Sequence, residues 1–89
     1  MLSEQTYAEI AGLSQRCLEQ ISTRDVVDRV TVIRGYVQLL AIRPARKDYE
    51  AKLVATLIEL SDLAARHRQP ELARSLQTLA MTIDLERAS

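Results

Sequence analysis

The sequence is poor in residues that break or cross-link a chain. Its 89 residues include two glycines, two prolines, one cysteine and three tyrosines, but no tryptophan or phenylalanine. An all-β fold of this length needs a turn residue roughly every 8 to 12 positions, so the shortage of glycine and proline favours helices. A single cysteine, Cys17, excludes an internal disulfide.

Excess charge and long apolar runs are lacking as well. Twelve basic and twelve acidic side chains give a net charge of zero, so no overall field favours nucleic acid or an anionic membrane surface. The longest uncharged apolar stretch, residues 35–42, is far shorter than the roughly 20 residues that span a bilayer. The first residues lack the cationic start and apolar run of a secretion signal, so we expect a cytoplasmic protein without nucleic-acid or membrane partners.

Apolar residues recur at helical spacing along most of the chain. The pattern predicts helices at about residues 4–21, 23–42, 46–67 and 70–86. Pro44 ends the second helix because proline disfavours helical geometry at the preceding residue, whereas Pro70 suits the first turn of the fourth. Between the first two helices the apolar pattern changes phase near Ser22, and no glycine or proline marks a turn. One long helix and two separate helices both fit, and we prefer the continuous helix.

The second helix carries the strongest periodic signal. Its apolar residues step by four and three, as in the seam of a packed helix pair, and the third helix has a matching stripe. The predicted dimer or bundle seam consists of Val26, Val30, Ile33, Val37, Leu40, Leu53, Leu57 and Leu60. A chain this short buries only about 60 to 65% of its unfolded surface, which favours pairing with a second copy. The expected fold is therefore all-α. We expect one domain over residues 1–89, an antiparallel helical hairpin or bundle of three to four helices completed as a dimeric four-helix-type bundle.

Few residues could carry catalysis. His67 lies between two arginines at the predicted end of the third helix, where a solvated cation interacts well with the helix dipole. Cys17 lies on an apolar stripe, where a free cysteine behaves as a small buried hydrophobe. Neither glycine belongs to a phosphate-binding loop, and the Glu-x-x-His pairs of di-metal bundles are missing. We expect no enzyme, and no catalytic, cofactor-binding or metal site.

Residues 23–40 read TRDVVDRVTVIRGYVQLL. This segment resembles the phosphoacceptor helix of sensor histidine kinases and of the sporulation phosphorelay phosphotransferase. In that family His-Asp-x-x-Asn is followed by an apolar run with Ile-x-Gly-x-x-x-Leu, and a helical hairpin pairs with a second copy into a four-helix bundle. Asp25 matches the acid, and Ile33, Gly35 and Leu39 match the later pattern. The resemblance implies that residues 45–63 form the second arm of the hairpin.

The segment differs from the family at the residues that carry out phosphoryl transfer. Arg24 stands in place of the phosphoacceptor His and Asp28 in place of the Asn, and arginine is no nucleophile for phosphoryl transfer. The resemblance therefore implies a degenerate, non-catalytic member. Such a helical dimerisation and interaction module would pair with itself and regulate a two-component or sporulation phosphorelay, with Arg24, Asp25 and Asp28 meeting a histidine kinase or response regulator.

Three alternatives stay open. The same three charged residues could be an ordinary solvated helix face. The chain could be a generic helical-bundle subunit of a larger complex, docking through the apolar arc of residues 26–42. It could also be a phosphotransfer protein that uses His67.

Overall fold

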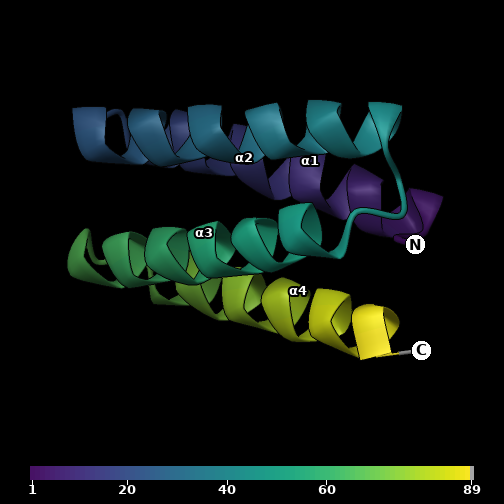
Figure 1. The fold of residues 1–89 in the computed structure, drawn as a ribbon. Coiled ribbons are helices and arrows are strands. Elements are labelled where there is room, and N and C mark those ends of the chain that lie inside the picture. The colour runs from purple at the N-terminus through teal and green to yellow at the C-terminus, as the bar shows by residue number, and fades with distance from the viewer. Residues whose placement is uncertain (89) are drawn as a thin grey trace.

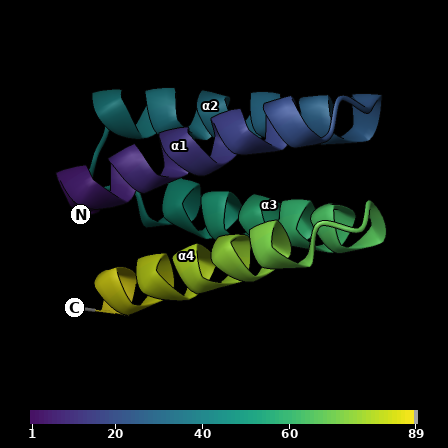
Figure 2. The ribbon, with the colours of Figure 1, turned by 180° about the vertical axis from the view of Figure 1, so that it is seen from behind.

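The computed structural model describes residues 1–88, which fold into four α-helices (Figure 1). They are α1 (Glu4–Gln20), α2 (Arg24–Ile42), α3 (Lys47–Arg66) and α4 (Pro70–Ala88). Successive helices run antiparallel, and each lies beside its two neighbours in an up-down-up-down bundle of about 34 × 21 × 19 Å (Figures 1 and 2). The prediction of an all-α helical bundle is confirmed. The fourth helix, expected over residues 70–86, extends to Ala88, and Ser89 lies outside the described residues.

The prediction that the first two segments form one continuous helix is wrong, because α1 ends at Gln20 and α2 begins at Arg24. The chain reverses through extended backbone, with φ −135° at Ile21 and φ −83° at Thr23. Negative φ values suit any residue, so this turn needs neither glycine nor proline. The reversal buries both Ile21 and Val26 in one core. The phase change in the apolar pattern therefore marks a turn between two helices, each of which buries its own apolar face in the same core.

Local hydrogen bonds define the start of α1 and the end of α3. The Ser3 hydroxyl accepts a hydrogen bond of 3.1 Å from the Thr6 amide and caps α1. After α3, the amide of Gln69 donates to the Ala64 carbonyl and that of Arg68 donates to the carbonyl of residue 65. This is the Schellman pattern, with Arg68 at φ 62° in the left-handed position that glycine usually occupies. The tight turn brings α4 back along α3.

The predicted seam lies inside a single chain. Seven of its eight residues are buried, and Val37 is half-buried against them. Helices α1 and α4 close the core with Ile10, Cys17, Leu72, Leu76, Leu79 and Ile83. Because four helices of one chain surround the seam, a partner chain has to use another face. No helix among residues 1–88 combines the length and the apolar character needed to cross a membrane.

Candidate functional site

The three charged residues singled out by the resemblance lie at the start of α2. Arg24, Asp25 and Asp28 are all exposed, within the first two turns of the helix. They are accessible on the surface of the bundle and lie outside its core. Their side chains are therefore in contact with solvent, although Asp25 also has partners within the chain.

Asp25 lies beside His67, which is 42 residues further along the chain. The His67 Nε2 atom is 3.4 Å from the Asp25 carboxylate and 3.4 Å from the Thr23 hydroxyl. Thr23 also donates a hydrogen bond to Asp25, as does the Val26 amide at 2.8 Å. The Thr23 hydrogen bond above all, together with those from His67 and Val26, lowers the pKa of the Asp25 carboxyl. The carboxylate is therefore ionised at neutral pH and joins the α1–α2 turn to the end of α3.

This cluster lacks the geometry of a hydrolytic relay. In such a relay the acid and the hydroxyl occupy opposite nitrogens of the imidazole, whereas Asp25 and Thr23 both face Nε2 of His67. A phosphoryl group on Nε2 would also lie next to the Asp25 carboxylate and be repelled by it. These contacts instead connect the α1–α2 turn to the turn that follows α3.

The other end of the bundle holds a buried carboxylate. Glu50 is 1% exposed, and its Oε1 atom lies 3.9 Å from Arg87 Nε. Nearby, Glu86 accepts a hydrogen bond of 2.8 Å from the Thr6 hydroxyl. Burial, and then the charges of Glu50 and Glu86, raise the pKa of the Tyr7 phenol. These contacts connect α1, α3 and α4 at the end of the bundle where α1 and α3 begin and α4 ends (Figure 1).

Metal-binding and nucleophilic groups are sparse. Within the part of the chain that the structure describes, no three His, Cys, Asp or Glu side chains gather to hold a metal ion. Cys17 is buried, and its burial raises the pKa of the thiol to about 11. The thiol therefore stays protonated at neutral pH, when it is a poor nucleophile.

Helix α2 presents an apolar stripe to solvent, which we call the α2 outer face. The stripe steps by three and four residues and consists of Val32, Gly35, Leu39 and Ile42, with Tyr36 at its edge. Leu39 is 40% exposed and Ile42 is 76% exposed. Four of these residues, all but Ile42, line a shallow hollow of about 470 Å³. A Cβ atom at Gly35 would meet no atom within 4 Å beyond its chain neighbours and its own helical turns, so none of the other described residues packs against this side of α2.

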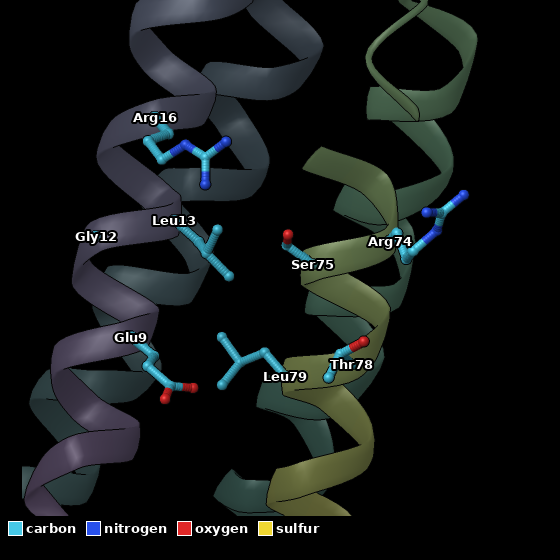
Figure 3. A pocket seen from close by; sticks show the side chains of 8 residues that line it. All are labelled: Glu9, Gly12, Leu13, Arg16, Arg74, Ser75, Thr78 and Leu79. Carbon is cyan, nitrogen blue, oxygen red and sulfur yellow. The ribbon is translucent and has the colours of Figure 1, made fainter. Parts of the chain in front are cut away.

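A larger hollow lies between α1 and α4, and we call it the α1/α4 groove. Its volume is about 500 Å³, and it is lined by Glu9, Gly12, Leu13, Arg16, Arg74, Ser75, Thr78 and Leu79. Figure 3 shows Leu13 and Leu79 pointing toward one another across it, with Arg16 and Glu9 reaching in from α1 at different heights. The Arg74 side chain points away from α1.

A third hollow lies on the opposite side of α1. It measures about 220 Å³ and lies between α1 and α2, where it includes Ser14 and Arg34. The hydroxyl of Ser14 is buried and finds no hydrogen-bond partner among residues 1–88. Helix α1 therefore has a hollow on each side, one toward α4 and one toward α2.

Sequence reasoning missed the groove and the His67 contact with Asp25. Gly12 was the only local signal for the groove, since a glycine within a helical run is costly unless something approaches it. The His67 contact has no local signal because its members come from two different turns. Comparison with models of protein families, with curated proteins and with solved structures finds no match to this chain.

Proposed function

We propose that this chain is a non-enzymatic helical interaction module that forms a homodimer through the α2 outer face. Gly35 carries the proposal. A glycine within a helix costs about 1 kcal/mol relative to alanine, and its usual benefit is the close approach of another backbone. Within residues 1–88 no other segment makes that approach. A second copy crossing α2 at Gly35 would use the space.

The residues around Gly35 suit such a crossing. Val32, Leu39 and Ile42 provide apolar surface on either side of the glycine, where a partner helix would bury them. A two-fold axis near Gly35 would bring the same face of each copy together, as in most homodimers.

Charge favours an antiparallel crossing. Asp28 precedes Gly35 by about 10 Å along the helix, and Arg43 follows it by about 12 Å. Both side chains are exposed. An antiparallel pair would bring Asp28 of one copy near Arg43 of the other, whereas a parallel pair would oppose like charges.

Light scattering across a hundredfold concentration range tests the dimer, with circular dichroism to check folding. We expect twice the chain mass of 10.0 kDa at high concentration. Leu39→Glu should lower the mass to that of a monomer. Met81→Glu is the matched control, because Met81 is 66% exposed but lies on α4. A wild-type monomer at every concentration, or equal loss in both variants, would overturn the proposed interface.

A charge exchange tests the direction of the crossing. Asp28→Arg and Arg43→Asp should each weaken the dimer, and the double variant should recover part of the loss because the pair is restored with opposite signs. A double variant as weak as the sum of the two single variants would contradict the antiparallel arrangement.

We propose more specifically that this interaction module regulates a two-component or sporulation phosphorelay in the cytoplasm. In the single chain Arg24, Asp25 and Asp28 are all exposed at the start of the dimerising helix, and Arg24 and Asp25 support this proposal because the proposed dimer pairs Asp28 with Arg43 of the second copy. With Arg24 in place of the reactive His, the module would compete for a kinase or response regulator without passing phosphate on. A generic bundle subunit would use the α2 outer face for a different protein. Phosphotransfer through His67 is the weaker alternative, since Asp25 faces its Nε2 atom.

A pull-down from the source cell's extract tests the phosphorelay proposal. We expect a histidine kinase or response regulator among the captured proteins, and we expect its loss with the Arg24→Glu variant. Met81→Glu is again the control. Capture of neither class of protein by the wild type would contradict the phosphorelay role and leave the dimer proposal standing.

A further inference from the structure

We infer that the hollow between α1 and α2, which we call the α1/α2 hollow, binds a small aliphatic carboxylate such as hexanoate. The carboxylate contacts Ser14 and Arg34, and the hydrocarbon chain lies against Ile10 and Val37. All four residues line the hollow. Arg34 and Val37 lie on another face of α2 than Gly35, so the hollow stays open in the proposed dimer.

The size of the α1/α2 hollow selects a small molecule. Its volume is about 220 Å³, which corresponds to about seven water molecules. An α-helix is about 10 Å across, so no helix of another chain enters a hollow of this volume. Sites for drug-sized ligands measure about 300–1,000 Å³, and the ligand of this hollow is therefore smaller than those.

The buried side of the hollow holds a hydrogen-bonding group without a partner. Ser14 is 2% exposed, and its hydroxyl finds no hydrogen-bond partner among residues 1–88. A buried hydroxyl without a partner destabilises a fold, so a serine at this position is costly unless another molecule bonds to it. Because Ser14 lines the hollow, its hydroxyl is available to donate a hydrogen bond to a ligand there.

The charge of the hollow selects an anion. Arg34 lines it, and none of the described residues that line it is acidic. Among residues 1–88 Arg34 enters no ion pair, and its Nη2 atom donates one long hydrogen bond of 3.4 Å to the side-chain oxygen of Gln15. A guanidinium has five N–H donors, so most of them remain for a ligand.

Antiparallel packing places the two polar groups at the same end of the hollow. Helices α1 and α2 meet at the turn of residues 21–23. Ser14 is nearer to that turn along α1 than Ile10 is, and Arg34 is nearer to it along α2 than Val37 is. The hydroxyl and the guanidinium therefore share one end, and the apolar pair lies beyond them.

A carboxylate with a short hydrocarbon chain matches this distribution. It is ionised at neutral pH, and its oxygens only accept hydrogen bonds, whereas Ser14 and Arg34 offer donors. Its chain would cover Ile10 and Val37. Inorganic phosphate would leave this apolar part unfilled, and a neutral alcohol would leave Arg34 without a counter-charge.

Titration of ¹⁵N-labelled protein with hexanoate, followed by ¹H–¹⁵N correlation NMR, tests the site. For the eight non-hydrogen atoms of hexanoate we expect a Kd of about 1 mM, with the largest shifts at the amides around Ser14 and Arg34. Hexan-1-ol has the same chain without the charge, and inorganic phosphate has the charge without the chain. Each should bind at least about fivefold more weakly than hexanoate.

Two substitutions separate binding from folding. Ser14→Ala removes the unpartnered hydroxyl, so it should leave the Tm equal or higher while weakening hexanoate binding by about threefold to tenfold. Arg34→Gln should weaken binding by a similar factor. Arg16→Gln is the matched control, because Arg16 is also exposed but lies on the other side of α1. Leu39→Glu should leave hexanoate binding unchanged, which separates this site from the dimer interface.

Several results would overturn the site. They are the absence of shifts around Ser14 at about twenty times the expected Kd, binding of hexan-1-ol or phosphate as tight as that of hexanoate, and unchanged binding in Ser14→Ala and Arg34→Gln. A lower Tm in Ser14→Ala would also overturn it, because the hydroxyl would then have a partner within the chain. A fall in molar mass on adding hexanoate would mean that an acidic side chain of a second copy occupies the hollow instead.

Discussion

Replacing Gly35 with alanine separates the stability of the chain from its self-association. Apart from the backbone of its own helical turns and its two chain neighbours, the added methyl group meets no atom of residues 1–88 within 4 Å, and Gly35 has no positive φ that alanine would resist. Alanine in a helix interior is favoured over glycine by about 1 kcal/mol. We therefore expect Gly35→Ala to raise the free energy of unfolding of the monomer by about 1 kcal/mol. For a domain of this size, that corresponds to a rise in Tm of about 4–8 °C.

Urea denaturation followed by far-ultraviolet circular dichroism, at a concentration where the chain is monomeric, measures this change. Gly12→Ala is the matched control, because Gly12 also lies within a helix with open space around its Cα. Both variants should gain similar stability as monomers. At high concentration they should differ, since the methyl group of Gly35→Ala separates two crossing helices and that of Gly12→Ala does not.

Two results would refute the reasoning. A loss of monomer stability in Gly35→Ala would mean that the glycine serves a contact within the chain. Equal self-association of the wild type and both alanine variants would mean that no helix crosses α2 at Gly35.

The remaining predictions concern the core, the thiol and one carboxyl group. Leu57→Ala should lower the free energy of unfolding by about 2–5 kcal/mol because Leu57 is fully buried, whereas Ile58→Ala, at an exposed position, should change it by no more than about 0.5 kcal/mol in the same urea titration. Cys17 should react with a thiol reagent at about pH 8 roughly a hundredfold more slowly than a thiol with the ordinary pKa of 9.0, since its own is about 11, and a rate equal to that of the urea-unfolded chain would contradict its burial. Asp25 has a lower pKa in the folded than in the unfolded chain, so its stabilising contribution is present above the unfolded pKa and is lost as pH falls through the folded one. Asp25→Asn should flatten the pH dependence of stability below about pH 5, and an unchanged curve would contradict the lowered pKa.

The amino-acid sequence by itself determined the helices and the faces they bury. Helical periodicity is a local property, so the stripe of Val26, Val30 and Ile33 in α2 and the stripe of Leu53 and Leu57 in α3 could be assigned to a core without knowing what covers them. Gly35 could likewise be recognised as a costly residue that needs a reason.

Only the tertiary structure decided which faces meet and where the chain turns. The reversal at Ser22 has no glycine or proline to mark it, and the turn after α3 uses Arg68 in the position where glycine is usual. Both turns follow from the burial of four stripes in one core, a sum over the whole chain that no short segment contains. For the same reason the contact between Asp25 and His67 could not be predicted, because it exists only once the two turns lie at the same end of the bundle.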